Sequence, residues 1–434
     1  MSTGPWTEPR AAAPVTPPAP APLPPPAPDD APPPPAPAPG APAPAPLSDR
    51  RHSPAPPSPL PPGGGTGRLR NVLRPTGIYL VSRLGTLAVV AALAYTQRRS
   101  VGSLLSYWDG KWYLLAAQHG YPSTIPPGHG NSAQSTLGFF PLLPLLIRAV
   151  AVITRLPIEG AGLLVTFLAG LAAAVVAWHL LRDLTGPESA DRGTALIFFS
   201  PGAFVLSMVY GEGLLITFSA GCLIALRQRK WWVAGVLAAL ASATDPLGIA
   251  AAAPCVIAAF LAVIERRQWQ SLVAPALAPL GVVAFFAYLW AHDGTPLAWF
   301  IAQRRGWQAG HLGTGIYDAF SYLPGHGFSN VNNDVKAASV LVVLTMLVIL
   351  LLRRSAMRAP VTVVAYVLAV LVLAALSPIV ALSPRVALRA FPLLGLVGAW
   401  MGRLPYYVLL GLFALVMAAL LVLSLSTSPI PFTP

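Results

Sequence analysis

Residues 76–96 read TGIYLVSRLGTLAVVAALAYT, and this predominantly apolar run decides the fold class. Its length matches the roughly 20 residues that an α-helix needs to cross a bilayer. Apolar blocks of similar or slightly shorter length recur as far as the C-terminus. A lipid-exposed backbone must satisfy its own hydrogen bonds, and a helix does so. We therefore expect an all-α polytopic membrane protein with about eleven membrane-embedded helices.

The composition indicates that lipid is the solvent of this chain. Of its 434 residues, 55% are hydrophobic and 10% are charged, and a mean hydropathy of +0.63 is too high for one soluble core. The net charge is +13, but basic residues stand singly or in pairs beside apolar blocks, so they indicate topology and not nucleic-acid binding. Cys222 and Cys255 lie inside apolar blocks, so neither a disulfide framework nor a CxxC metal site is expected.

The N-terminal segment has a different character. Residues 1–68 contain 26 of the 49 prolines, interleaved with alanine. Such a segment buries almost nothing and is expected to be a disordered, polyproline-II-like cytoplasmic tail. We interpret it as a tether, with partner binding as the alternative. It lacks the features of a signal peptide, so the first helix should be retained and residues 69–434 should form the transmembrane domain.

Basic residues predict which loops face the cytoplasm. Three arginines precede the first helix and place the N-terminus inside by the positive-inside rule: Arg68, Arg70 and Arg74. The loop after Thr96 is then extracytoplasmic. If residues 137–155 crossed the membrane, three later basic loops would face outward, against the rule: residues 227–230, 266–267 and 353–354. We therefore expect 137–155 to be a re-entrant or surface helix, as its two prolines also favour.

The other spans follow from this choice. They are expected at residues 160–181, 194–209, 214–226, 232–242, 248–264, 272–290, 337–352, 361–376, 387–401 and 406–423.

Under this topology, unusual polar residues collect on the extracytoplasmic side. The first outer loop reads YWDGKWYL at residues 107–114. As a helix, it would place Trp108 and Trp112 on one face, suited to the membrane interface. Asp109 stands beside this face, and the alternative reading is that it only caps the helix.

Two more acids are predicted at the same side. Glu212, in Tyr210-Gly211-Glu212, lies between two otherwise uncharged spans. Inserting an acid there costs roughly a few kcal/mol of free energy unless its carboxylate contacts water or a partner side chain, so by default such an acid marks a functional site. Asp245 precedes a proline at similar depth. A simple turn is the alternative reading for both acids.

Outward-facing arginines complete the pattern. Arg385 and Arg389 open the span that begins near residue 387, and arginine can grip a phosphate in bidentate fashion. Snorkelling to lipid headgroups is the alternative. We find no Walker loop, dinucleotide GxGxxG, HExxH or GxSxG motif. The acids, aromatic residues and arginines together favour chemistry on a membrane-bound anionic substrate.

Five sequence pieces in this order resemble the bacterial PIG-V-like mannosyltransferases of the GT-C class, which use polyprenyl-phosphate sugars. The resemblance covers about residues 75–400. The pieces are Trp108-Asp109-Gly110-x-Trp112-Tyr113 with Gly120-Tyr121, residues 139–144, Ser200-Pro201 with Tyr210-Gly211-Glu212, residues 296–300 with Gln303, and Pro384-Arg385 with Phe391-Pro392. The family usually has Ser or Thr in place of Gly211, Arg in place of Asp245 and Tyr in place of Val386.

The resemblance implies transfer of a hexose, mannose by family, from a polyprenyl monophosphate to an extracytoplasmic or lipid-linked acceptor, with inversion and Asp109 as the base. We expect Arg385, with Arg389 second, to hold the phosphate, and Glu212 to orient hydroxyl groups. The remaining candidates for substrate binding are Trp108, Trp112, Tyr113, Tyr210, Asp245, Trp299 and Gln303. No cofactor or metal cage is expected, and a role for a divalent ion stays open. A transporter or lipid flippase, and an inactive relative acting as a scaffold, are the alternatives.

Overall fold

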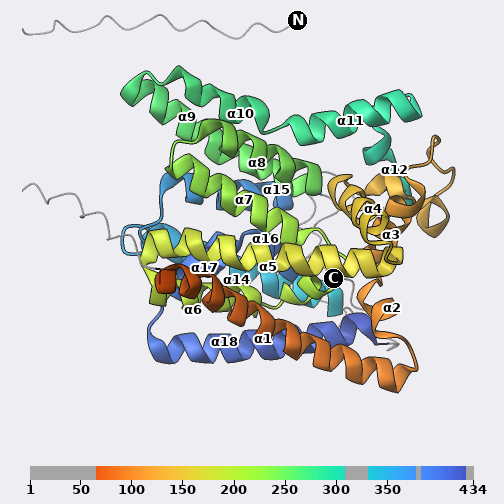
Figure 1. Ribbon diagram of the computed structural model, residues 1–434, viewed down its shortest axis with the longest axis horizontal. Coiled ribbons are helices and arrows are strands. Elements are labelled where there is room, and N and C mark those ends of the chain that lie inside the picture. The colour runs from red at the N-terminus through yellow and green to blue at the C-terminus, as the bar shows by residue number, and fades with distance from the viewer. Residues whose placement is uncertain (1–64, 308–330, 378–382, 427–434) are drawn as a thin grey trace, which may run out of the picture. The chain divides into compact units, whose positions relative to one another are not determined.

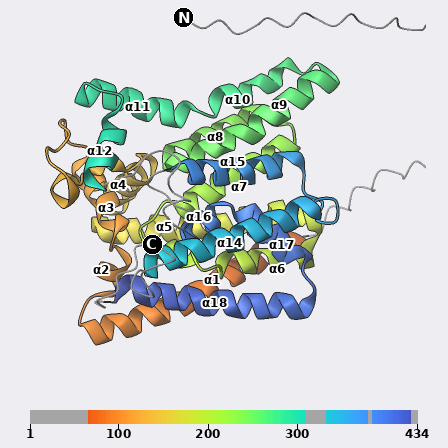
Figure 2. The same ribbon diagram turned by 180° about the vertical axis from the view of Figure 1, so that it is seen from behind.

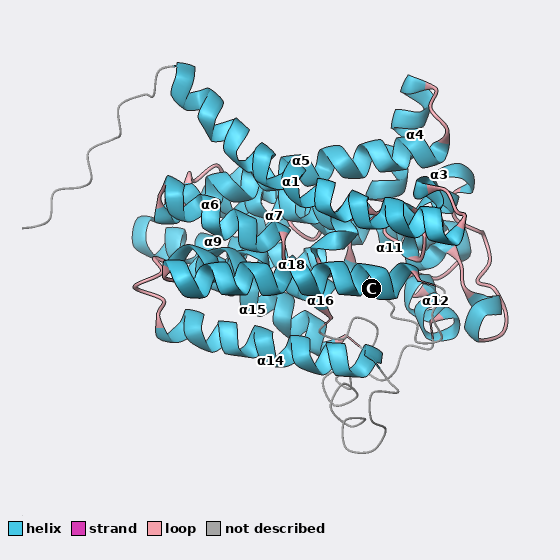
Figure 3. Ribbon diagram, turned by 90° about the horizontal axis from the view of Figure 1, so that it is seen from below, coloured by secondary structure: helices cyan, strands magenta, loops and turns pink. Residues whose placement is uncertain are grey.

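The computed structural model describes residues 65–307, 331–377 and 383–426. Throughout these ranges the regular elements are α-helices and short 3₁₀ turns, as Figure 3 shows. The predicted all-α class is therefore confirmed. The predicted tail lies outside the described residues except for its last four positions, where helix α1 has already begun at Gly65.

Among the described residues, five helices are long and apolar enough to cross a membrane. They are α1 (Gly65–Gln97), α5 (Ile158–Thr185), α9 (Ala252–Arg266) with the preceding turn η4 (Pro246–Ala251), α14 (Val331–Leu352) and α18 (Arg403–Leu425). A pair of helices bent by 43° would make a sixth if the two form one broken span and not a re-entrant loop. It comprises η5 (Trp269–Leu272) and α10 (Val273–Leu277), followed by α11 (Leu280–Asp293). Length and composition thus do not confirm the expected eleven spans.

The other predicted spans are occupied by shorter helices. These are α6 (Pro187–Phe198), α7 (Glu212–Arg227), α8 (Trp231–Thr244), α15 (Val361–Leu376), α16 (Pro384–Arg389) and α17 (Phe391–Trp400). The prediction of one helix over residues 194–209 is wrong, because α6 ends at Phe198 and is followed by the 3₁₀ turn η3 (Ala203–Ser207). Pro201 lies at the break, where a proline has no N–H and cannot continue a helix.

The first outer loop and its partners gather at one end of the bundle, on the right in Figure 1. They are α2 (Val101–Leu105), α3 (Asp109–His119), η1 (Gly130–Ala133), η2 (Thr136–Gly138), α4 (Leu142–Thr154) and α12 (Ala298–Gly306). Helix α4 has 13 residues, which span about 20 Å. This is shorter than the hydrocarbon core of about 30 Å, but so is α8 with 14 residues, and that residues 137–155 do not cross stays a prediction.

Three basic loops lie at the opposite end of the bundle. They join α7 to α8, α9 to α10 and α14 to α15, and they sit on the left in Figure 1 and on the right in Figure 2. Helix α1 runs from that end toward α2, and α5 runs back. The arginine clusters are therefore separated from the loop that carries Asp109 by the length of the helices.

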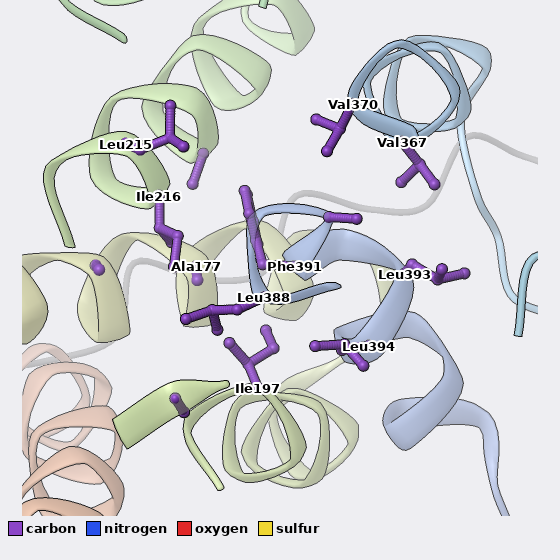
Figure 4. Packing of buried hydrophobic residues seen from close by; sticks show 14 of the residues in the cluster. Ala177, Ile197, Leu215, Ile216, Val367, Val370, Leu388, Phe391, Leu393 and Leu394 are labelled. Atoms are coloured by element: carbon purple, nitrogen blue, oxygen red, sulfur yellow. The ribbon is translucent and has the colours of Figure 1, made fainter. Parts of the chain in front are cut away.

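The main hydrophobic core surrounds the α16–α17 segment. Figure 4 shows Leu388 and Phe391 facing Ile197 of α6 and Ile216 of α7, and all four are fully buried. This packing leaves α16 little freedom, which matters because α16 also carries two arginines.

Candidate active site

Asp109 is the first residue of α3 and is fixed from two sides. Its backbone N–H donates to the Tyr210 hydroxyl at 3.3 Å. The preceding residue, Trp108, has φ 54° and ψ −122°, a sparsely populated conformation for a residue with a side chain. Its indole N–H donates to the carbonyl oxygen of Ser424 in α18 at 2.8 Å. Trp108 therefore anchors the start of α3 to the last turn of α18.

Five side chains form one continuous series of ion pairs, which we call the carboxylate–arginine chain. Its order is Asp109, Arg385, Glu212, Arg389 and Asp245. Arg385 Nη1 lies 2.6 Å from Asp109 Oδ2, and its Nε donates to Glu212 Oε1. Arg389 Nη2 lies 2.9 Å from the same Glu212 oxygen and 2.7 Å from Asp245 Oδ2. The structure thus joins four separate sequence segments.

Local structure explains why these segments can meet. Arg385 and Arg389 are four residues apart on α16, so they project from the same side of that helix. Glu212 is the first residue of α7, and Asp245 caps η4 by accepting the Leu247 N–H at 2.9 Å. With Asp109 at the start of α3, all three acids stand at helix N-termini, where the backbone dipoles favour negative charge.

The Asp109 end of the carboxylate–arginine chain is more exposed than the rest, which includes Asp245 at 8%. The exposed fraction of the side chain is 29% for Asp109 and 13% for Arg385, but 3% for Arg389 and 1% for Glu212. A ligand therefore reaches Asp109 and Arg385 first. Three carboxylates and two guanidinium groups give these five residues a formal charge of −1.

Two tyrosines line the chain. The Arg385 guanidinium carbon lies 4.5 Å from the centre of the Tyr210 ring, within the range of a cation–π contact. Burial raises the pKa of both the Tyr113 and Tyr210 phenols well above its usual value, and the nearby carboxylates act in the same direction. Both phenols therefore stay neutral at physiological pH.

The other aromatic candidates lie in the outer-loop packing and not in the carboxylate–arginine chain. Trp112 stacks on Phe139, with ring centres 6.2 Å apart. Trp299 Nε1 and Gln303 Nε2 both donate to the carbonyl oxygen of Gly138, at 3.1 and 2.8 Å. Both donors are thus occupied by the backbone next to η2.

Two mainly apolar spaces have lining residues that lie close in sequence to members of the chain. A cavity of about 470 Å³ extends from Ala116 of α3 to Ala243 of α8, and Arg148 is the charged residue in its lining. A second space of about 230 Å³ is lined by Pro384 and Ala387 of α16, on either side of Arg385 in sequence. Among the residues that the structure describes, no group of three or more His, Cys, Asp or Glu is arranged to hold a metal ion.

Sequence reasoning missed one buried cation. Arg83, in the middle of α1, is 3% exposed and donates hydrogen bonds to residues near η3. A single arginine inside the first apolar run was the available signal, because a charge at that depth needs partners.

No protein-family model matches the chain, and no curated protein matches it. Among solved structures, ArnT from Cupriavidus metallidurans bound to undecaprenyl phosphate is similar, with 16% identity, a TM-score of 0.48, and coverage of 85% of this chain and 67% of that one. The Archaeoglobus fulgidus oligosaccharyltransferase tethered with an acceptor peptide has 13% identity, a TM-score of 0.47, and coverage of 82% and 56%. Its apo form has 13% identity, a TM-score of 0.43, and coverage of 81% and 56%. This chain therefore spans little more than half of the oligosaccharyltransferase structures, and similarity at this level carries no functional argument.

Proposed function

We propose that the protein is a membrane glycosyltransferase of the GT-C type. It transfers a hexose, mannose by the sequence resemblance, from a polyprenyl monophosphate to a hydroxyl group on the extracytoplasmic side. The observation that carries the proposal is the carboxylate–arginine chain, in which a partly exposed acid and a partly exposed arginine meet beside apolar space.

Asp109 is assigned the role of general base. Its Oδ2 atom is held by Arg385, whereas Oδ1 receives no hydrogen bond from the described residues. With one oxygen fixed, the other is oriented to take the acceptor proton as the sugar is transferred. Such a positioned base contributes roughly 10² to 10⁴-fold to the rate.

Arg385 is assigned the role of binding the leaving phosphate. Its Nε and Nη1 atoms bind Glu212 and Asp109, and within the described parts of the chain Nη2 makes no hydrogen bond. Nη2 can therefore donate to a phosphate oxygen while the other two nitrogens hold the guanidinium in place. Fixed donors of this kind stabilise the charge that grows on the leaving group. Arg389, deeper and already bound to two carboxylates, keeps Glu212 and Asp245 in position.

The apolar spaces suit the lipid part of the substrate. Both are lined mainly by aliphatic and aromatic side chains. The smaller one includes Pro384, next to Arg385 in sequence, and the larger one includes Ala243, two residues before Asp245. An alkyl chain bound there would hold its phosphate near Arg385 through hydrophobic burial. Attack by the acceptor hydroxyl on the face of the anomeric carbon opposite the leaving phosphate would invert that carbon.

The test compares Asp109→Asn with a matched control, Asp183→Asn. Asp183 is also partly exposed, at 34%, and pairs with an arginine at 2.7 Å, but it lies on α5 away from the site. Membranes containing each variant receive radiolabelled polyprenyl-phosphate-mannose, and the label entering product is measured. We expect Asp109→Asn to reduce transfer about 10² to 10⁴-fold and Asp183→Asn to retain it. Equal transfer by both variants would end the assignment.

A further inference from the structure

Arg83 is a buried cation whose Nε donates to the neighbouring Ser82 hydroxyl at 3.2 Å, whereas the hydrogen bonds of its two Nη atoms converge on one turn. Nη2 donates to the carbonyl oxygen of Phe198 at 3.0 Å. Nη1 donates to the carbonyl oxygen of Ala203 at 2.7 Å and to the Ser207 hydroxyl at 3.0 Å. Among the described residues, no carboxylate pairs with Arg83. We call residues 199–207, which follow Phe198 and include the acceptors Ala203 and Ser207, the Arg83 turn.

The acceptors explain why an arginine is stable at this depth. Phe198 is the last residue of α6, and the final carbonyl groups of a helix have no partner within it. The helix dipole also favours a cation there. The planar guanidinium reaches three acceptors in different directions at once, which the ammonium group of lysine cannot do with the same geometry. Arg83 thereby replaces the hydrogen bonds that the chain loses where α6 stops.

The Arg83 turn touches the arginine side of the candidate site. A Cβ atom on Gly202 would clash with the Pro384 carbonyl group and would lie 2.7 Å from the Arg385 backbone nitrogen. Gly202 thus packs directly against the start of α16. Because Ala203 is bound by Arg83, the guanidinium is connected to the backbone of Arg385 through two residues of the turn.

The same turn leads into the acid side of the site. After Ser207 the chain continues to Val209, whose N–H donates to the Leu105 carbonyl at 3.0 Å, and then to Tyr210 and Glu212. Tyr210 receives the Asp109 N–H. A shift of the turn would therefore move Glu212 and the anchor of Asp109 together.

We propose that Arg83 is a positioning residue that fixes the Arg83 turn and thereby sets the relative placement of Arg385 and Glu212. Its effect on catalysis rests on the proposed function, whereas its effect on the turn does not. The two can therefore be measured separately.

The first experiment measures amide hydrogen exchange by mass spectrometry over residues 199–211 of the full-length protein in detergent. Arg83→Lys and Arg83→Met are compared with Arg182→Met, a surface arginine on α5 that is 30% exposed. We expect faster exchange in this segment by about tenfold or more for Arg83→Met, a smaller increase for Arg83→Lys, and none for Arg182→Met. Wild-type exchange in both Arg83 variants would overturn the proposal. If Arg83→Met does not fold, Arg83→Lys alone decides.

The second experiment asks whether Arg83 acts through Glu212. Sugar transfer is measured for Arg83→Lys, Glu212→Gln and the double variant. A positioning role predicts that the double variant loses little more than Glu212→Gln alone, since the residue being positioned is already disabled. If the losses of transfer in the two single variants multiply in the double variant, Arg83 acts independently of Glu212. That outcome would contradict the proposal. Absence of transfer by the wild type would contradict the proposed function instead, and the exchange data would still decide the role of Arg83 at the turn.

Discussion

At the scale of single residues, the site depends on charges that support one another. Burying an unpaired ion costs several kcal/mol, and the attraction between partners offsets this only when the hydrogen bonds are good. The Arg389 side chain is 3% exposed, and its Nη2 atom binds both Glu212 and Asp245, whereas its Nε and Nη1 atoms are buried without a hydrogen-bond partner among the described residues. Asp245 therefore has a structural reason to be an acid in this chain.

This reasoning predicts the effect of Asp245→Asn on stability. The amide retains a hydrogen-bond acceptor but removes one of the two negative charges next to Arg389. We expect a lower melting temperature in detergent, with a loss of stability below the roughly 3–5 kcal/mol seen when a buried ion pair is broken completely. Asp183→Asn is the control, since its pair is at the surface and contributes about 0–1 kcal/mol. Equal melting of the two variants would contradict the structural role of Asp245.

The positions of the acids could be predicted from sequence, but their partners could not. Glu212 and Asp245 are conspicuous because charges are rare in apolar blocks, and that rule needs no structure. Which arginine each acid binds depends on how α7, α8 and α16 pack. The same limit applies to Trp299 and Gln303, which the sequence suggests for substrate binding. In the structure both side chains donate hydrogen bonds to the carbonyl oxygen of Gly138. A pattern of side chains in the sequence cannot predict a backbone partner of this kind.

At the scale of elements, short helices with capped ends build the interior. Helix α6 ends at Phe198, where Arg83 binds the last carbonyl group. Helix α17 ends at Trp400, where Arg192 donates to the carbonyl oxygens of Ala399 and Met401 at 3.0 and 2.7 Å. Both helices are too short to cross a bilayer alone. Hydropathy predicts which segments of the chain are apolar. A helix break such as the one at Pro201 does not lower the hydropathy of the segment around it. For this reason the prediction of one continuous span over residues 194–209 was wrong.

Helices α6 and α17 pack closely because glycines face each other. A Cβ on Gly193 would clash with the carbonyl oxygen of Gly395, and backbone cannot move aside as a flexible side chain can. Small residues allow such close approach in membrane helices. The contact supports α17, which follows Arg389 of α16 after one residue.

Gly193→Val is therefore expected to destabilise the protein, by roughly 1–3 kcal/mol or more, as overpacking does. The matched control is Gly411→Val on α18, since a Cβ on Gly411 meets nothing within 4 Å. Thermal stability by fluorescence-detected size-exclusion chromatography distinguishes them. A Gly193→Val protein as stable as the Gly411→Val protein would show that the two helices are not held at this contact.

At the scale of the whole described bundle, the three basic loops and the loop that carries Asp109 lie at opposite ends. The loops with Arg227–Lys230, Arg266–Arg267 and Arg353–Arg354 lie at one end, and α2, α3, α4 and α12 lie at the other (Figures 1 and 2). This arrangement requires that α4 does not cross the membrane. The positive-inside rule then assigns the basic end to the cytoplasm. Asp109 and the donor phosphate would accordingly meet on the extracytoplasmic side.

Cysteine labelling tests this orientation. The native thiols, Cys222 and Cys255, are buried with their sulfur atoms 3.6 Å apart, so both are replaced by alanine before single cysteines are introduced. Lys111→Cys reports on the Asp109 end, and Arg229→Cys reports on the basic end. Both positions are exposed.

A membrane-impermeant maleimide applied to intact cells should label Lys111→Cys, and should label Arg229→Cys only after the membrane is opened. The charge asymmetry gives the reason, because each basic loop opposes translocation and three of them must act together. Labelling of Arg229→Cys from outside would place the carboxylate–arginine chain at the cytoplasmic face. An enzyme that uses an extracytoplasmic lipid-phosphate sugar would then have its base on the wrong side of the membrane.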